Sequence, residues 1–309
     1  MKILVYGAGV IGSVYSAFLH GGGHEVSVLA RGRRLAEIRE HGILLEEAPS
    51  GRRMEAKVST VQRLDPEDAY DLVLVAMQKG HIAPVLPILA ANSHTPTVAF
   101  LGNNAAGPDE LTKALGAERV LMGFPGFGGH FEGPIARYAS EDAGARRLCL
   151  TLGELDGRTT PRLRTIGQAL SDADIDVALE PEIDAWLKGH VALVVPILFA
   201  LRRHGLDNQA LARDRGALRL MARAVREGLT VLRRLGYPIT PFRLKMIAFL
   251  PVFATAAAFA KIIGSEFARI AFAGHAASAA HEFDLLLDEF RGLIARSGLA
   301  TPAIDELCE

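Results

Sequence analysis

The chain has 309 residues, of which half are hydrophobic and 22% are charged. This length exceeds that of one ordinary core and predicts two globular domains, and the composition excludes extended disorder. The 34 basic residues nearly cancel the 35 acidic ones, which leaves no broad basic field for nucleic acid. We therefore expect no nucleic-acid partner.

The first half of the chain alternates short β-branched runs with amphipathic stretches, which is typical of a mostly parallel sheet with helices on both faces. The expected elements are, in chain order, Ile3–Tyr6, Val10–His20, Glu25–Leu29, Arg34–His41, Leu72–Val75, Ile82–Ala90, Thr97–Leu101, Asp109–Leu115 and Val120–Met122. Between Gly123 and Gly157, short runs such as Arg147–Thr151 are expected to extend the sheet. Thr160–Ser171 predicts one more helix, and Ile175–Leu179 predicts the last strand.

From about Pro181 onward the periodicity is helical, with almost no strand signal. The expected helical segments are Ile183–Leu201, Ala210–Leu235, Pro241–Ile263 and Ala277–Ser297. The predicted fold is therefore α/β, with a Rossmann-type doubly wound parallel sheet in residues 1–180 and an all-helical domain in residues 181–309. We expect the substrate at the junction of the two domains.

The run Met246–Ala260 is uncharged but shorter than the ~20 residues that a membrane span needs, and it contains Pro251. We expect it to form a buried helix pair, and we expect no membrane contact. A surface that meets lipid, a partner subunit or an apolar ligand is the alternative. Such an apolar helical domain is also compatible with a homodimer formed through it.

The sequence shows neither a paired-cysteine motif nor a signal peptide. Cys149 and Cys308 lie far apart and form no metal or redox motif. The apolar run after Met1 is too short for the core of a signal peptide. These observations predict a cytoplasmic location.

Three glycines, Gly7, Gly9 and Gly12, form G-x-G-x-x-G between the first expected strand and helix. The first glycine permits a tight turn, the second lets the backbone approach a pyrophosphate, and the third lets helix and strand pack closely. The phosphates then lie at a helix N-terminus, which favours anions. The expected cofactor-binding residues of this loop are Gly7, Ala8, Gly9, Val10, Ile11 and Gly12.

The end of the second expected strand indicates which dinucleotide is bound. Roughly 20 residues beyond the glycine motif, an NAD enzyme carries an acidic residue for the ribose hydroxyl. This chain has Arg31 there, with Arg33 and Arg34 close behind. Because a guanidinium matches a 2′-phosphate, we expect the cofactor to be NADP(H).

Motifs along nearly the whole chain resemble the ketopantoate reductase family. They are, in matching order, GAGVIGSVYSAFL, VSVLARG, DLVLVAMQKG, LGNNAAGPDEL, EIDAWLKG, LGYPITP, HEFDLLLDEF and ARSGLATP. The resemblance implies an oxidoreductase that reduces a small-molecule 2-keto acid with NADPH, as in 2-dehydropantoate 2-reductases of pantothenate biosynthesis.

The resemblance places the family's catalytic lysine on Lys188, which would donate a proton to the carbonyl oxygen and stabilise the developing alkoxide. Lys188 is also the only charge between Asp184 and Arg202, in an otherwise apolar segment. A lysine in such a helix is either functional or extends its ammonium group to solvent.

By the same resemblance, the family's late glutamate, which binds the substrate hydroxyl and the lysine, falls on Glu282, with Asp284 matching the acid that follows. The family's asparagine after the fifth strand falls on Asn103, with Asn104 beside it. We expect Asn103 at the cofactor or substrate; a turn-forming asparagine pair is the alternative.

The chain also departs from the family pattern. Ala192 and Pro196 stand where the family commonly has asparagines, on the helix face of Lys188. Pro196 should also kink that helix. Gln78 stands where the family often has a lysine after the fourth strand, and the adjacent Lys79 is the alternative replacement; we expect both residues at the cofactor. These changes predict either ketopantoate itself or a larger, less polar 2-keto acid as substrate.

Two readings of the function therefore remain open. The first is an NADPH-dependent 2-keto acid reductase. The second is an NADP(H)-binding sensor or interaction protein of the same fold without turnover. No metal is expected in either case, because His190, His275 and His281 lack metal-ligand spacing.

Overall fold

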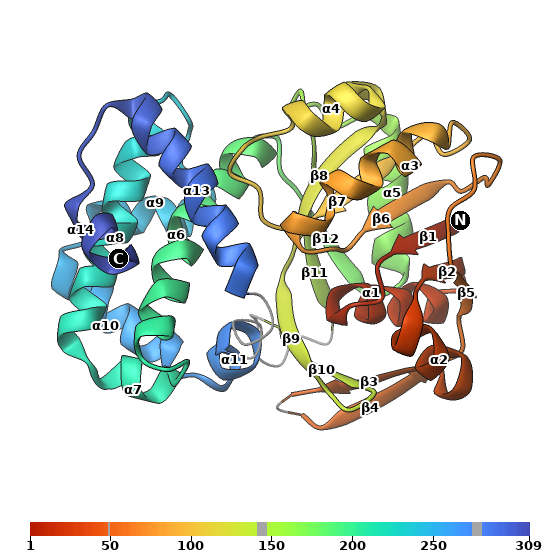
Figure 1. The fold of residues 1–309 in the computed structure, drawn as a ribbon, viewed down its shortest axis with the longest axis horizontal. Coiled ribbons are helices and arrows are strands. Elements are labelled where there is room, and N and C mark those ends of the chain that lie inside the picture. The colour runs from red at the N-terminus through yellow and green to blue at the C-terminus, as the bar shows by residue number, and fades with distance from the viewer. Residues whose placement is uncertain (49, 141–146, 274–279) are drawn as a thin grey trace. The chain divides into compact units, whose positions relative to one another are not determined.

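The computed structural model describes residues 1–48, 50–140, 147–273 and 280–309 (Figure 1). It divides into two compact units. Unit 1 comprises residues 1–102 and 108–183, and unit 2 comprises residues 103–107 and 184–309. Unit 2 thus contains a five-residue loop that is inserted, in the sequence, within unit 1.

Unit 1 is built on an eight-stranded sheet with the order β12-β11-β8-β7-β6-β1-β2-β5. Its strands are β1 (Lys2–Tyr6), β2 (Glu25–Leu29), β5 (Ser59–Val61), β6 (Leu72–Val75), β7 (Val98–Leu101), β8 (Val120–Pro125), β11 (Leu148–Glu154) and β12 (Ile175–Leu179). All neighbouring strands are parallel except β11 and β8. The order reverses between β1 and β6, the switch point at which doubly wound sheets bind ligands.

A second, four-stranded sheet with the order β4-β3-β10-β9 corrects one expectation. Its strands are β3 (Ile43–Glu47), β4 (Arg52–Ala56), β9 (Phe127–Glu132) and β10 (Ile135–Ser140). We expected the segment after Gly123 to extend the main sheet, and only β8 and β11 do so. The reason is that β10 pairs with β3, a strand distant in sequence that carries no alternating pattern of its own.

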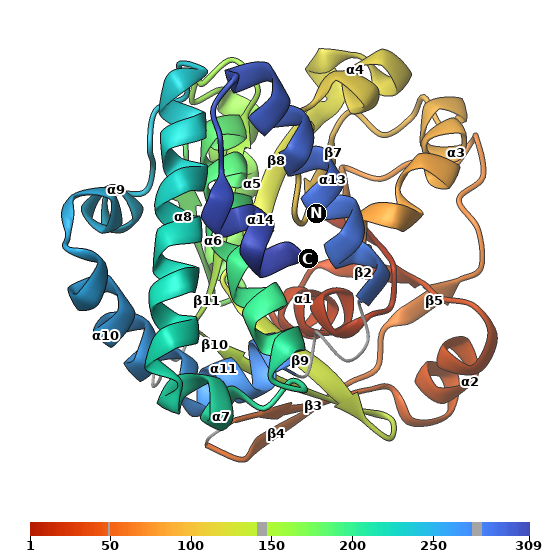
Figure 2. The ribbon, with the colours of Figure 1, turned by 60° about the vertical axis from the view of Figure 1, so that its left-hand side comes forward.

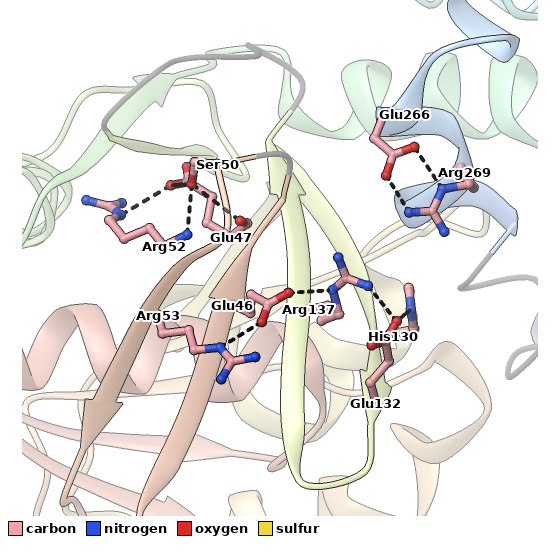
Figure 3. A network of polar contacts seen from close by, with 10 residues as sticks. All are labelled: Glu46, Glu47, Ser50, Arg52, Arg53, His130, Glu132, Arg137, Glu266 and Arg269. Atoms are coloured by element: carbon pink, nitrogen blue, oxygen red, sulfur yellow. Dashed lines mark hydrogen bonds and ion pairs between the residues drawn. The ribbon is translucent and has the colours of Figure 1, made fainter.

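Charged side chains connect the strands of this small sheet (Figure 3). Glu46 on β3 binds Arg53 on β4 at 2.9 Å and Arg137 on β10 at 3.0 Å. Arg137 in turn binds Glu132 on β9 at 2.7 Å. Cross-strand pairs of opposite charge stabilise a sheet modestly and fix its register.

The helices of unit 1 are α1 (Val10–Gly21), α2 (Gly32–His41), α3 (Leu86–Ala91), α4 (Asp109–Leu115) and α5 (Pro161–Asp172). Helix α1 packs against strands of both sheets (Figure 1). The amphipathic stretch expected at Ile82–Ala90 is instead a 3₁₀ turn, η2 (Ala83–Val85), followed by the short α3; η1 (Lys79–His81) precedes them and η3 (Ala117–Arg119) precedes β8. Proline occupies the first turn of both η2 and α3, where it interrupts a longer helix.

Unit 2 is helical apart from its loops. Its elements are α6 (Ile183–Arg203), α7 (Asn208–Arg213), α8 (Arg215–Arg234), α9 (Phe242–Phe249), α10 (Val252–Ile263), α11 (Glu266–Ala268), the π-helical turn η4 (Arg269–Ala273), α13 (Ala280–Ser297) and α14 (Pro302–Cys308). Helix α8 contacts α7, α9, α10, α13 and α14 and forms the centre of the unit (Figure 2). The two units together confirm the predicted fold class.

The segment expected as one helix from Ala210 to Leu235 is divided into α7 and α8. Asp214 ends α7 and caps α8, because its carboxylate accepts a hydrogen bond from the N–H of Ala217 at 3.0 Å. Helix α6 continues through Pro196 to Arg203. Within the described residues, α6 alone is long and apolar enough to cross a membrane, but 78% of its apolar window is buried, as in a core helix.

Helices α9 and α10 correct the expectation of a buried pair. Leu244 is the buried residue of α9, whereas Phe249 and Phe253 each expose 68% of their surface. Phe242 and Met246 are exposed as well. We call these four exposed side chains the α9–α10 apolar face, because large apolar side chains exposed on neighbouring segments of a chain are typical of interaction surfaces.

Candidate functional site

The glycine loop follows β1 and leads into α1. Gly7 has φ +116°, a conformation that side chains rarely adopt, and a Cβ there would lie 2.7 Å from the carbonyl oxygen of Ala76. A Cβ on Gly12 would collide with the carbonyl oxygen of Gly7. These two glycines are therefore required by the turn and by the packing of α1 on the sheet.

Gly9 is different, because neither its backbone nor its packing demands a glycine. Its φ of −67° suits any residue, and no atom of the described residues lies within 4 Å of a Cβ built on it. Gly9 is the N-cap of α1, and no side chain caps that end. Open space before uncapped N–H groups suits a pyrophosphate, so these residues fit a dinucleotide cofactor.

Arg34 on α2 fastens this loop to the rest of unit 1. Its guanidinium donates to the carbonyl oxygens of Ala8, at 3.3 Å, and Pro134, at 3.1 Å, and to the hydroxyl of Ser13, at 3.0 Å. It also lies 4.5 Å from the ring centroid of Phe131 on β9. Arg34 is therefore a structural residue that joins the glycine loop, α2 and the small sheet.

Arg31 stands at the N-cap of α2 and is exposed. Its Nε donates to the carbonyl oxygen of Gln62 at 3.3 Å. Burial raises the pKa of the Tyr6 phenol at the end of β1, and the neighbouring Arg31 guanidinium opposes that shift. Arg31 thus lies beside the end of β1, next in sequence to the glycine loop. Arg33 points to solvent and pairs with Glu37 at 3.2 Å.

Gln78 and Lys79 follow β6, the strand on the other side of the switch point. Gln78 caps the 3₁₀ turn η1, and both side chains are half-buried. In doubly wound sheets, ligands bind at the carboxyl ends of the parallel strands. Gln78 and Lys79 follow such an end.

Lys188 in unit 2 is almost fully buried, with 2% of its surface exposed. Its ammonium donates a hydrogen bond to the carboxylate of Asp184, one turn earlier on α6. It also lies 4.9 Å from the ring centroid of Tyr237. A Cβ on Gly107 would lie 3.3 Å from the ammonium nitrogen, so glycine at this position leaves room for it.

The loop Asn103–Gly107 is held against this lysine by two side chains. Asn104 closes the loop, because its amide bonds the carbonyl oxygen of Gly107 at 3.0 Å and the N–H of Gly107 at 2.9 Å. Glu289 on α13 accepts from the N–H groups of Ala105 and Ala106, at 2.9 and 3.1 Å.

Asn103 begins the loop, and its Oδ1 is buried with no hydrogen-bond partner among the described residues. A buried polar atom in this condition calls for a ligand or a bound water. The turn-forming role weighed for the asparagine pair therefore belongs to Asn104 rather than to Asn103.

Glu282 lies in the first turn of α13 and is 5% exposed. Asp284 is exposed and binds Arg202 on α6 at 3.1 Å, which is a surface ion pair. Ala192 is buried beside Gly228 and Phe290, and Pro196 is buried as well. The two positions that lack the family's asparagines are thus filled by apolar packing.

Sequence reasoning missed the partners of Lys188 and of the loop. Asp184 could have been found, because an acid four residues before a lysine on a helix predicts an ion pair. Glu289 carried no such signal, since its partners are backbone N–H groups distant in sequence.

Histidines and acidic groups offer little further chemistry. Within the described ranges, no group of three or more His, Cys, Asp or Glu side chains could hold a metal ion. His281 is exposed, and His275 lies outside the described residues. His190 stacks on Trp186 with ring centroids 5.4 Å apart, and burial lowers its pKa to about 4.

Comparison with known proteins finds a family model and curated relatives that match this sequence. Residues 3–144 match the family model "Ketopantoate reductase PanE/ApbA". A 2-dehydropantoate 2-reductase of Halobacterium salinarum is 25% identical over 244 residues, which cover 78% of each chain.

Solved structures are similar in fold. A D-mandelate dehydrogenase determined with NADH and anilino(oxo)acetate has a TM-score of 0.79 at 19% identity and covers 99% of this chain and 96% of its own. A 2-dehydropantoate 2-reductase from Geobacter metallireducens has a TM-score of 0.77 at 17% identity and covers 99% of this chain and 97% of its own. Residues 3–144 thus resemble the ketopantoate reductase family, as the motifs predicted, and two thirds or more of the chain is similar to relatives named 2-dehydropantoate 2-reductase.

Proposed function

We propose that this protein uses NADPH to reduce the keto group of a small 2-keto acid to the 2-hydroxy acid. The observation that carries the proposal is the buried ammonium of Lys188 beside the loop of Asn103, whose Oδ1 lacks a partner among the described residues. A buried cation next to an unsatisfied amide suits a polar substrate whose oxygen becomes negative during reaction.

Each unit supplies one part of the chemistry. A nicotinamide cofactor, when bound, supplies the hydride for the keto carbon. Gly9 and the N-terminus of α1 receive its pyrophosphate, with Ala8, Val10 and Ile11 completing the loop. Arg31 binds the 2′-phosphate, because it is exposed and no acidic residue occupies its position. Gln78 and Lys79 border the cofactor at the end of β6.

The proton comes from unit 2. Lys188 donates it to the carbonyl oxygen as that oxygen gains negative charge, and the ammonium stabilises the charge until the transfer is complete. Glu282 binds the hydroxyl of the substrate, and Asn103 binds the cofactor or the substrate through its amide.

Two buried positions on the Lys188 helix bear on the choice of substrate. Ala192 and Pro196 are buried and cannot donate the hydrogen bonds that a polar 2-keto acid such as ketopantoate would require. The D-mandelate dehydrogenase of similar fold was determined with anilino(oxo)acetate, an oxo acid with an aromatic group. We therefore expect bulkier, less polar 2-keto acids to be turned over better than ketopantoate.

The experiment is a screen of NADPH oxidation over 2-keto acids, with ketopantoate, branched aliphatic and aromatic members included. Turnover of any member by the wild type, with NADPH bound in a separate titration, supports the reductase. NADPH binding without turnover of any member would favour the sensor, the second function that the family fold permits. Efficient turnover of ketopantoate would refute the altered substrate but not the reductase.

A further inference from the structure

Asp184 and Lys188 form an ion pair whose two members differ in their access to solvent. Both lie on α6, one turn apart, and the lysine ammonium donates to Oδ1 of the aspartate. The side chain of Lys188 is 2% exposed, whereas that of Asp184 is 30% exposed. The carboxylate is therefore the end of the pair that water can reach.

This asymmetry matters because a lysine that gives up a proton in each catalytic cycle must recover one. The ring of Tyr237 and the backbone of Gly107 also lie near the ammonium. The ring face and the glycine Cα carry no exchangeable proton, and among the described residues the ammonium makes no hydrogen bond to the Tyr237 hydroxyl. Within the described part of the chain, Asp184 is the carboxylate that contacts the ammonium.

We propose that Asp184 is a positioning residue that holds the Lys188 ammonium against the Asn103–Gly107 loop and returns its proton after each turnover. The inference rests on the proposed reductase function. Lys188 loses one proton to the carbonyl oxygen and becomes a neutral amine. Asp184 then takes one proton from solvent and passes it to the amine nitrogen, which restores the ammonium and the carboxylate. Each cycle consumes one solvent proton, as the reduction of a keto group by a hydride requires.

The pair lies close to the loop. A Cβ on Gly107 would lie 3.3 Å from the lysine nitrogen and 3.5 Å from Oδ1 of Asp184, so the loop backbone passes near both charged groups. Glu289 fixes the same loop from α13. The charged or titratable groups around the lysine are thus Asp184 on α6, Tyr237 after α8 and, through the loop, Glu289 on α13.

The test compares Asp184→Asn and Asp184→Glu with the wild type. Asp288→Asn is the matched control, because Asp288 is an exposed aspartate of α13 whose partner is Arg291. Steady-state kinetics with NADPH and the best 2-keto acid of the screen are measured in H₂O and D₂O from pH 5.5 to 9.5. The NADPH affinity and the circular dichroism of each variant report whether it is folded.

We expect Asp184→Asn to lower kcat by about 10–100-fold, within the range for a lost proton-transfer group, with KM changed by less than about threefold. Its solvent isotope effect on kcat should exceed that of the wild type, because proton return becomes rate-limiting. Activity should also fall at a lower pH than in the wild type, and added imidazole buffer should restore part of kcat. Asp184→Glu should keep kcat within about fivefold of the wild type and retain its isotope effect.

A folded Asp184→Asn variant with the kcat, isotope effect and pH profile of the wild type would overturn the role of Asp184. If the asparagine variant does not fold, a folded Asp184→Glu variant that has lost kcat without any change in isotope effect would overturn it as well. A wild type that binds NADPH but turns over no 2-keto acid would instead refute the proposed function, so the two failures are distinguishable.

Discussion

Arg34 donates to the hydroxyl of Ser13 at 3.0 Å, and Ser13 in turn lies in the first turn of the helix that follows the glycine loop. The same guanidinium holds the carbonyl oxygen of Ala8. Its hydrogen bonds are thus directed at the protein itself. This separates Arg34 from Arg31, although the two stand close together in the sequence.

Removing Arg34 should therefore lower the stability of the fold and reduce the affinity for NADPH and for NADH alike. Arg34→Ala leaves the carbonyl oxygens of Ala8 and Pro134 without their charged donor, which costs about 1.5–3 kcal/mol of unfolding free energy. Urea unfolding measures this cost, and titrations should show NADPH and NADH weakened by similar factors. A stable variant that loses only NADPH would mean that Arg34, too, reads the 2′-phosphate.

Arg31→Asp should change the choice of cofactor and leave stability intact. The wild type should bind NADPH more tightly than NADH by about 1–3 kcal/mol, and the variant should lose or invert that preference, because a carboxylate repels the 2′-phosphate. Fluorescence titration of both cofactors gives the two affinities. Arg33→Asp is the control, since Arg33 points to solvent. Equal affinities in the wild type would refute the NADPH assignment.

Lys188→Ala should lower kcat by about 10²–10⁴-fold, the range for general acid catalysis, with NADPH affinity nearly unchanged. Glu282→Gln should be milder and appear mainly in KM, because the proposed role of Glu282 is to hold the substrate hydroxyl. Steady-state kinetics and NADPH titration separate these effects. A fully active Lys188→Ala variant would end the proposed mechanism.

His190 should make the protein less stable as the pH falls. Burial lowers its folded pKa from 6.5 to about 4, so the unfolded chain binds a proton between these values that the folded protein does not. The unfolding free energy should therefore decrease as the pH falls from about 6.5 to about 4. Urea titrations at several pH values measure this slope. His190→Phe should flatten it, whereas His41→Gln, at an exposed position, should not. An unchanged slope in His190→Phe would contradict the assignment.

The α9–α10 apolar face predicts a homodimer formed through the helical unit. Phe249 and Phe253 expose large apolar surfaces that association would remove from water. Phe249→Ser with Phe253→Ser should convert the dimer to a monomer in light scattering after size exclusion. Phe131→Ser, on a less exposed phenylalanine of unit 1, should not. A monomeric wild type would show that some other partner, or none, meets this face.

Much of the fold could be predicted from local signals. Strands such as Glu25–Leu29 and Ile175–Leu179 were predicted with the bounds of β2 and β12, because short β-branched runs flanked by turn residues are distinctive. The small sheet could not be predicted, because Ile43–Glu47 pairs with a hairpin far along the chain. Pairing between strands so far apart in the sequence produces no hydrophobic periodicity that either segment would show by itself.

The candidate site shows the same division. Gly7, Gly9 and Gly12 could be identified with a mechanism, since each glycine answers a different geometric need. The exposure of Phe249 and Phe253 could not be predicted, because an apolar run has the same sequence pattern whether its side chains are buried or exposed. Burial is a property of the assembled helices rather than of any single segment.

The five residues Asn103–Gly107 have a consequence for recombination. They belong to the helical unit 2, yet in the sequence they lie within unit 1. A cassette cut at the junction near Asp184 and transplanted into a homologue would leave this pentapeptide behind. Glu289 would then meet a foreign loop instead of the N–H groups of Ala105 and Ala106. A chimaera that keeps the contacts of Glu289 should therefore take both segments of unit 2, residues 103–107 and 184–309, from the same parent.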